Sequence, residues 1–431
     1  MATQSSANKC EEAGQRVHGV GAFLILSSLF FQAMCITTPL LHTDGKNFKD
    51  PAGNIVILRG VDLGDLAMMN TQRGSMNVSK MIDTLTNASH GWYAYLIRLC
   101  ISPGTWLGNP DSYYNNQLKP AVDYCVSKGV YCIVDWHYVA DPAPNANSTV
   151  QFWTYVAPKF KTYSNVFYEI YNENSSTSMT WDQWKTTYAQ PWVDLIRQQA
   201  PDNIILVGGP SWSQHIGGSA TNPVTGKNIA YVGHIYPQNP TSLWSSNGEI
   251  TVAAKSNPVV MTEWGYLQGA AVPCSGTQTS FGNPFKAWVE STGVSWTAWC
   301  ADDVWDPKMF NSDWSLRTGE NQMGGFVKDW LNEKRTSNLP STTSSSARGT
   351  RSAPRASVGP VFRLTGGFLR FEPPAAGAWT LRIIAASGQC LVEYRSVANA
   401  VSLPVNQFVP GAYIAQLSNG KSEFQYPLYL P

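Results

Sequence analysis

The sequence predicts an α/β fold, a closed (β/α)8 TIM barrel, followed by a linker and a small all-β sandwich. Three observations predict it. Between residues 43 and 335, eight segments rich in β-branched and aromatic residues alternate with helical patterns. Each of these segments ends in polar residues, as barrel strands do where they reach an active site. After Arg335 the composition changes, first to Ser, Thr, Pro and Arg and then to short alternating strands.

The eight predicted strands are short apolar runs bounded by turn residues. They are NIVILRGVDL (54–63), AYLIRLCISP (94–103), VYCIVDWHYV (130–139), NVFYEIYNEN (165–174), NIILVGGPSW (203–212), IAYVGHIYP (229–237), PVVMTEWGY (258–266) and VSWTAWCADD (294–303). Strands that alternate with helices form parallel sheets, and eight such units close a barrel. A doubly wound open sheet is the alternative, but no glycine-rich dinucleotide fingerprint follows the first strand.

Helical patterns fill the segments between these strands. In residues 115–129, apolar side chains recur from Leu118 with the i, i+3, i+4, i+7 spacing of one helix face, and Gly129 stands where a C-terminal cap belongs. Residues 180–203 form a second long helical pattern, which Pro191 interrupts. Strand and helix periods therefore alternate as a barrel requires.

An apolar stretch near the N-terminus, Val20–Cys35, has the length of a signal-peptide core and is short for a membrane span. The segment before it contains Glu11 and Glu12, which are untypical of the basic start of a signal peptide. We predict that residues 1–36 are a signal peptide or an N-terminal hydrophobic anchor. The protein is then secreted, extracellular or at the cell surface, with the bacterial periplasm as an alternative. A stable membrane partner is expected only if the segment is retained.

The region after the barrel divides into two parts. Residues 336–360 are rich in Ser, Thr, Pro and Arg, have no apolar period and predict a flexible linker. Residues 361–431 alternate apolar and polar side chains between turn signals, which predicts a small β-sandwich. Its sequence resembles the short C-terminal sorting or cell-surface attachment domains of some bacterial secreted enzymes. A carbohydrate-binding module is the rival interpretation.

The composition limits the partners that the protein can have. A net charge of +1 with 14% charged residues gives no electrostatic basis for nucleic-acid binding. The 17 tryptophans and 19 tyrosines include many in predicted loops, where flat aromatic rings suit the faces of sugars. We therefore expect a polysaccharide partner and a monomeric protein.

Polar and aromatic residues stand at the ends of the predicted strands, where a barrel places its active site. They are Arg98, His137, Asn172, Glu173, His234, Tyr236, Glu263 and Trp299. Glu173 and Glu263 end the fourth and seventh strands, and glycoside hydrolysis requires such a pair of carboxyl groups. Arg98 would keep Glu263 ionised, while burial and the neighbouring negative charge would keep Glu173 protonated.

With these residues in order along the barrel, residues 43–335 resemble glycoside hydrolase family 5, whose members are retaining barrel enzymes. YEIYNEN is similar to the family's Asn-Glu signature, which implies Glu173 as the acid/base and Asn172 as the partner of the sugar's 2-hydroxyl. MTEWG is similar to the nucleophile motif and implies Glu263. The resemblance assigns the rest of the family's invariant set to Arg98, His137, His234, Tyr236 and Trp299. GGPSWSQ resembles a loop of bacterial cellulases whose tryptophan, here Trp212, stacks on glucose.

The resemblance implies a retaining endo-β-1,4-glucanase, acting on cellulose or soluble β-glucans without a cofactor. A β-mannanase, a xyloglucanase and a mixed-linkage glucanase are alternatives on the same barrel, and the Trp212 loop favours a glucan. A non-catalytic carbohydrate-binding protein is a more distant alternative, although none of the catalytic motifs has decayed. A metal site built from Asp135, His137 and His234 is a further alternative that no spacing motif supports, so no metal is predicted.

Three smaller expectations concern neighbours of the site. A disulfide between Cys274 and Cys300 is the first guess for an exported protein, because both fall near the ends of late strands. Glu169 shares strand parity with Glu173 and should lie one layer deeper in the barrel, with Arg59 as the expected partner. Further tryptophans either bind sugar or pack in loops. They are Trp106, Trp136, Trp153, Trp244 and Trp305.

Overall fold

The structure, a computed structural model, divides into two compact units, residues 1–344 and 345–431. It describes residues 38–341 and, in the second unit, 361–365, 368–372, 379–385, 389–394, 401–405, 408–409, 411–419 and 423–430. The predicted signal peptide or anchor and residues 342–360 of the predicted linker lie outside these ranges. Within them, no helix has both the length and the apolar character needed to cross a membrane.

The first unit is a closed barrel of eight parallel strands, which confirms the predicted fold. The strands are β4 (Arg59–Leu63), β5 (Leu96–Ile101), β6 (Tyr131–Trp136), β8 (Val166–Glu169), β10 (Ile205–Val207), β11 (Ile229–Ile235), β12 (Val259–Trp264) and β13 (Ser295–Ala298). Each pairs with the next along the chain, and β13 closes the barrel on β4. Every residue of these strands is buried, as both faces of a parallel barrel require.

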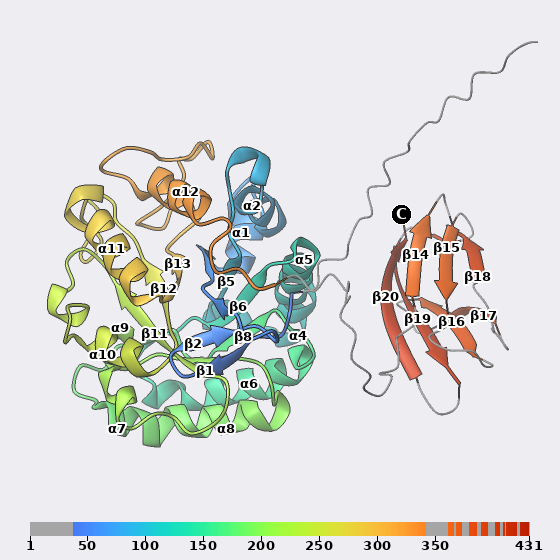
Figure 1. Ribbon diagram of the computed structural model, residues 1–431, viewed down its shortest axis with the longest axis horizontal. Helices are drawn as coiled ribbons and strands as arrows, with labels where there is room; N and C mark the ends of the chain where they lie inside the picture. The colour runs from blue at the N-terminus through green and yellow to red at the C-terminus, as the bar shows by residue number, and fades with distance from the viewer. Residues whose placement is uncertain are drawn as a thin grey trace, which may run out of the picture. The chain divides into compact units, whose positions relative to one another are not determined.

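Helices surround the strands on the outside of the barrel (Figure 1). They are α1 (Leu66–Gln72), α2 (Val78–Leu85), α3 (Pro103–Trp106), α4 (Pro110–Tyr113), α5 (Lys119–Lys128), α6 (Ala146–Phe160), α7 (Trp181–Trp184), α8 (Gln190–Gln199), α9 (Pro210–Ser213), α10 (Glu249–Ser256), α11 (Asn283–Thr292) and α12 (Met323–Glu333). The apolar faces of the longer helices pack against the outward side chains of the strands in one large core, whereas α9 is a turn in which Ser211 and Trp212 have non-helical backbone angles.

Local sequence explains where two of these helices end or change. Gly129 caps α5 with a left-handed φ of 66°, as predicted, because glycine adopts that conformation without steric cost. The pattern at 180–203 becomes α7 and α8 joined by the π-helical turn Lys185–Ala189. Pro191 then lies in the first turn of α8, directly after the π-helical turn.

The floor of the barrel, at the N-terminal ends of its strands, is apolar. A small antiparallel sheet of β1 (His42–Asp44), β2 (Asn47–Lys49) and β3 (Ile55–Val56) contributes Phe48 and Val56 to the cluster inside it. Phe48 lies 5.7 Å from Phe167 of β8, and Tyr131 of β6 lies 5.8 Å from the same ring, centroid to centroid. This packing leaves the opposite end of the barrel for chemistry.

The second unit consists of two antiparallel sheets and confirms the predicted small all-β domain. One sheet contains β14 (Val361–Thr365), β15 (Phe368–Glu372) and β18 (Val401–Pro404). The other contains β16 (Thr380–Ala385), β17 (Cys390–Tyr394), β19 (Gly411–Ser418) and β20 (Glu423–Leu430). Side chains from both sheets, among them Phe371 and Leu403 of the first and Leu381 of the second, form one core.

Candidate active site

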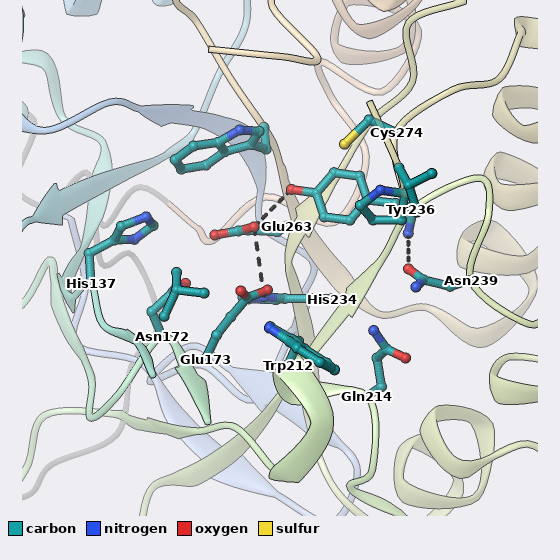
Figure 2. A pocket seen from close by; sticks show the side chains of 14 residues that line it. His137, Asn172, Glu173, Trp212, Gln214, His234, Tyr236, Asn239, Glu263 and Cys274 are labelled. Atoms are coloured by element: carbon teal, nitrogen blue, oxygen red, sulfur yellow. Dashed lines mark hydrogen bonds and ion pairs between the residues drawn. The ribbon is translucent and has the colours of Figure 1, made fainter. Parts of the chain in front are cut away.

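A pocket of about 530 Å³ opens at the C-terminal ends of the barrel strands. Its lining combines carboxylates, imidazoles and aromatic rings from strand ends and from the loops that follow them (Figure 2). The lining residues are His137, Val139, Asn172, Glu173, Trp212, Gln214, His234, Tyr236, Asn239, Glu263, Val272, Pro273, Cys274 and Trp299. The structure therefore brings together all of the sequence-predicted site residues except Arg98, which lies buried beneath the pocket.

Glu263, near the end of β12, is held as a carboxylate by donors on both of its oxygens. Arg98 Nη1 donates to Oε1 at 2.9 Å, and the hydroxyl of Tyr236 donates to Oε2 at 2.8 Å. Burial would raise the pKa of Glu263, but the charges of His234 and Arg98 outweigh it and lower that pKa below its ordinary value. The predicted Arg98–Glu263 contact is present, and Glu263 has the ionisation that a nucleophile needs.

A local irregularity turns Glu263 inward. Met261 and Trp264 both pack in the outer core against the helices, while Thr262 and Glu263 both contact groups inside the barrel. Strict alternation along β12 would place Glu263 outside with Met261. The pairing of β11 with β12 shifts register between Gly233 and His234, beside this stretch. The irregularity lets neighbouring residues serve the same site.

Glu173 does not end the fourth barrel strand as predicted, because β8 ends at Glu169. It faces Glu263 from β9 (Glu173–Asn174), which pairs with β7 (Val139–Ala140) above the barrel. Its backbone N–H donates to the carbonyl of Tyr138 at 2.9 Å, which fixes its position at the rim. Burial and the charge of Glu263 raise the pKa of Glu173, against the lowering effect of a hydrogen bond with His234. One oxygen of each glutamate lies within 4.8 Å of the other, and the two side chains point toward each other (Figure 2).

His234 of β11 lies between the two glutamates. Its Nδ1 is 2.8 Å from Glu173 Oε1 and 3.7 Å from Glu263 Oε2. Its Nε2 is 2.9 Å from the hydroxyl oxygen of Thr262. Burial would lower the pKa of His234, but the surrounding carboxylates, Glu263 first, raise it to about 10. A pKa raised this far favours the imidazolium form of the ring at neutral pH.

Glu169 does not pair with Arg59, so that prediction was wrong. Arg98 binds Glu169 through two hydrogen bonds, from Nε at 2.8 Å and from Nη2 at 2.9 Å. Arg59 points outward, where it donates to the carbonyls of Ile57 and Ser337. The reason is strand parity: on β4 the side chain of Asp62 lies beside Arg98 inside the barrel, and Arg59, three residues earlier, lies on the other face.

The remaining predicted residues line the pocket around the glutamates. His137 Nδ1 lies 2.6 Å from Asp135 Oδ2, which leaves Nε2 for a ligand, and its ring stacks on Trp299 at 5.2 Å. Asn172 accepts a short hydrogen bond from Arg98 and donates to the carbonyl of Tyr138 at 3.2 Å. These contacts hold both side chains in one orientation at the pocket wall.

Trp212 is presented to the pocket by a strained turn. Ser211, Trp212 and Ser213 all have positive φ, between 53° and 59°, which is uncommon for residues with a Cβ. Ser213 anchors the turn by donating to the carbonyl of Asn172 at 2.9 Å. The indole stays 38% exposed although it is large and apolar. Backbone strain that keeps an aromatic ring exposed at a pocket is typical of a binding position.

Several expectations about neighbouring residues are corrected or narrowed. Cys274 and Cys300 are free thiols, so the predicted disulfide is wrong: Cys274 lines the pocket, and the Cys300 thiol donates to the carbonyl of Trp305 at 3.6 Å. The three residues of the alternative metal site, Asp135, His137 and His234, do not fall in one cluster. Possible ligand atoms of Asp135 and His137 lie within 4.8 Å of Cys100, whereas that of His234 lies within 4.8 Å of Glu173 and Glu263. Three of the additional tryptophans are fully buried and pack in the core. They are Trp106, Trp136 and Trp153.

Some residues of the site were not found from the sequence. Thr262 contacts both His234 and Glu169, yet an isolated threonine in a strand carries no signal of such a role. Gln214 and Asn239 line the pocket from loops whose path the sequence does not reveal. Their positions depend on turns. Thr262 could not be found by parity either, because strict alternation beside an inward Glu263 would place Thr262 outside the barrel.

Comparison with known proteins decides the family. The family described as "Cellulase (glycosyl hydrolase family 5)" matches residues 51–304, more than half of the chain. The chain belongs to glycoside hydrolase family 5. An endoglucanase of Clostridium saccharobutylicum is 30% identical over 71% of this family 5 chain and 66% of its own length. An endoglucanase of Microbulbifer is 28% identical over 68% of this chain and 58% of its own length. The chain thus spans less than two thirds of both relatives.

Solved structures agree with this assignment of a glycoside hydrolase fold. A β-glucanase from Saccharophagus degradans matches with a TM-score of 0.62 and 26% identity, over 70% of this chain and 95% of that one. The catalytic domain of an endoglucanase from Thermobifida fusca matches with a TM-score of 0.58 and 24% identity, over 68% and 97%. The second likeness concerns the fold alone.

Proposed function

We propose that this family 5 glycoside hydrolase is a retaining endo-β-1,4-glucanase. The observation that carries the proposal is the pair Glu173 and Glu263, with oxygens within 4.8 Å and pKa values moved in opposite directions. Retaining enzymes have carboxyl groups about 5–5.5 Å apart, whereas inverting enzymes need about 6.5–9.5 Å to admit a water between them. One carboxyl kept protonated and one kept ionised are the acid and the nucleophile of such a mechanism.

In the first step, a carboxylate oxygen of Glu263 attacks the anomeric carbon, and the bond to the leaving glycosidic oxygen breaks. Glu173 transfers its proton to that oxygen. Since Glu173 Oε1 already faces His234, the proton is carried on Oε2. Arg98 and Tyr236 hold the attacking carboxylate in place. The Glu263 side chain therefore loses less conformational entropy on reaching the transition state.

In the second step, the Glu173 carboxylate accepts a proton from a water molecule, whose oxygen attacks the same anomeric carbon. The bond between that carbon and Glu263 breaks, and Glu263 leaves as a carboxylate. Two displacements at one carbon restore its configuration. Imidazolium His234, 2.8 Å from Glu173, stabilises the negative charge that Glu173 carries between the steps.

The preference for a β-glucan rests on the relatives and on the apolar surfaces of the pocket. The curated relatives cited above are named endoglucanases. Trp212 and Trp299 both line the pocket, and flat rings of this kind bind the axial C–H faces of glucose units. A β-mannanase, a xyloglucanase and a mixed-linkage glucanase remain the alternatives for the same catalytic residues.

Two assays test the proposal. Purified protein is incubated with carboxymethylcellulose, barley β-glucan, xyloglucan and mannan, and new reducing ends are measured. Proton NMR of the first products of a cello-oligosaccharide then follows the configuration of the new anomeric centre. We expect hydrolysis of carboxymethylcellulose and initial release of the β-anomer. Hydrolysis of mannan alone would reject the glucanase, and initial release of the α-anomer would reject the retaining mechanism.

We further propose that the protein is exported, acts as a monomer, and carries its second unit for sorting or attachment. Among the residues of that unit whose burial is described, Phe371 and Trp379 are buried in the core and Tyr394 is the one exposed ring, whereas a carbohydrate-binding module uses several exposed rings as a platform. Truncation after residue 344, where the first unit ends, should leave hydrolysis of soluble glucan intact. Loss of binding to insoluble cellulose on truncation would instead favour a carbohydrate-binding module.

A further inference from the structure

A buried chain of hydrogen bonds lies behind His234, on the side away from the substrate. His234 Nε2 is 2.9 Å from Thr262 Oγ1, and Thr262 Oγ1 is 3.0 Å from Glu169 Oε1. The side chains of Thr262 and Glu169 are fully buried, and neither residue lines the pocket. They therefore affect the reaction only through the groups that they contact.

The direction of each hydrogen bond follows from the charge of Glu169. Arg98 donates twice to Glu169, and this positive charge outweighs burial and lowers the pKa of Glu169 to about 2. A carboxylate only accepts, so the hydroxyl of Thr262 must donate its single hydrogen to it. The oxygen of Thr262 can then only accept from His234 Nε2. A proton must therefore reside on Nε2, and Nδ1 is left to face Glu173.

We propose that Thr262 and Glu169 are positioning residues that hold His234 as an imidazolium against Glu173 throughout hydrolysis. The inference rests on the proposed function of Glu173 and Glu263. Thr262 fixes the proton on Nε2, and Glu169 supplies the negative charge that stabilises it. The imidazolium in turn donates from Nδ1 to the acid/base, whether Glu173 is protonated on its other oxygen or ionised.

The groups around His234 all favour its charged form. Glu169 of β8 lies 3.8 Å from Nε2, Glu173 of β9 lies 2.8 Å from Nδ1, and Glu263 of β12 lies 3.7 Å from Nδ1. The nearby cation Arg98 is itself bound to Glu169 and Glu263. The ring is thus enclosed by three carboxyl groups, and the pKa values of two of them, Glu169 and Glu263, are lowered toward the ionised form.

A cation at this position acts on both catalytic carboxyls in the same direction. His234 lowers the pKa of Glu173 and the pKa of Glu263. Without the charge, both pKa values rise. Both limbs of the pH profile then move to higher pH. The acid limb is set by ionisation of Glu263, and the alkaline limb is set by loss of the proton from Glu173. A purely structural role of Thr262 would move neither limb.

The test compares Thr262→Val with Thr262→Ser. The valine removes the hydroxyl at nearly constant volume, and the serine keeps it. We expect both limbs of the kcat/KM profile on cello-oligosaccharides to shift up by about one pH unit in Thr262→Val and to return in Thr262→Ser. Thr149→Val is the matched control, because the buried Thr149 hydroxyl also accepts from a ring N–H, of Trp136, and donates to an oxygen. Unmoved limbs in a folded Thr262→Val would overturn the proposal.

A second measurement needs neither a stable variant of Thr262 nor hydrolysis. In protein with ¹⁵N-labelled histidine, the His234 ring is assigned by the signals that disappear in His234→Asn. We expect both ring nitrogens to be protonated at pH 8. A neutral ring at that pH would reject the positioning role, whether or not the protein hydrolyses glucans. An imidazolium at pH 8 in a protein that cleaves no glycan would support the chain of contacts and reject the proposed function instead.

Discussion

The two ends of the barrel use the same strands for opposite purposes. Along β8, Phe167 packs on Phe48 and Tyr131 at the floor, and Glu169, two residues further, binds Arg98 in the middle. Glu173 follows at the mouth. Inward positions therefore change from aromatic to ionic within one short strand. The floor gains stability from burial of apolar surface, whereas the mouth contains buried charges that must compensate each other.

Charge compensation at the mouth centres on the guanidinium of Arg98, beside the ring of His234. Arg98 lies within 4 Å of four carboxyl groups. They are Asp62 at 3.9 Å, Asp135 at 3.1 Å, Glu169 at 2.8 Å and Glu263 at 2.9 Å. One positive charge cannot neutralise four negative ones, and burial raises the pKa of Asp62 well above its ordinary value, which favours the neutral form of this carboxyl. From this contrast we expect that apolar side chains at the floor can be replaced by others of similar shape without loss of activity, while the charged side chains at the mouth cannot.

The largest effect should come from the nucleophile at the mouth. Glu263→Ala removes the group that bonds to the anomeric carbon, and we expect kcat/KM on carboxymethylcellulose to fall on the order of 10⁵-fold, equal to about 7 kcal/mol. Binding of cello-oligosaccharides, measured by calorimetry, should survive. Glu333→Ala, at a half-exposed position on α12, is the control and should keep full activity. Undiminished turnover in Glu263→Ala would contradict the assignment.

The acid/base should give a smaller effect that depends on the leaving group. Glu173→Gln removes the proton donor at constant shape, and we expect a loss of about 10²–10⁴-fold on unactivated glucans. With an aryl cellobioside whose phenol is a good leaving group, the first step needs no proton and should be nearly unaffected. A burst of phenol followed by slow turnover would separate the two steps. Equal losses on both substrates would count against Glu173 as the acid.

The difference between the ends also explains what the sequence could predict. All eight barrel strands follow from local apolar runs, and the strand ends identify Glu173, Glu263 and their neighbours. The partner of Glu169 was missed because Arg59 and Arg98 look alike in sequence, and only strand parity separates them. The roles of the predicted site residues stay predictions, which substitutions of Glu263, Glu173 and Trp212 test.

Register irregularities and turns limit prediction further. Glu263 points inward although Met261 points outward, because β12 does not alternate strictly beside a register shift. Three successive residues with positive φ direct Trp212 to the pocket, and no propensity rule predicts that conformation for Ser-Trp-Ser. Such features depend on tertiary contacts, so a strand or a loop can be found from sequence while the direction of one side chain cannot.

At the floor, a large cavity should cost stability and leave chemistry unchanged. Phe167→Ala removes a buried ring, and such substitutions destabilise proteins by about 3–5 kcal/mol. We expect a lower denaturant midpoint, with kcat/KM per folded molecule close to that of the wild type. Phe167→Leu should recover most of the stability. A selective loss of kcat in folded Phe167→Ala would show that packing at the floor controls the mouth, and the contrast between the two ends would fail.

The smallest effect should come from Trp212, which belongs to the mouth but takes no part in bond breaking. Its exposed indole can stack on a glucose unit beside the cleaved bond, and losing that contact should raise KM for long cello-oligosaccharides about tenfold, equal to about 1.4 kcal/mol. kcat and stability should change little in Trp212→Ala, and Trp212→Phe should restore part of the affinity. Val139→Ala, an exposed position on the same pocket, is the control. A ring that only packs in the turn would contribute to stability and not to KM, whereas a ring that only binds sugar would do the reverse. A drop in melting temperature with an unchanged KM would therefore assign Trp212 to the structure of the turn.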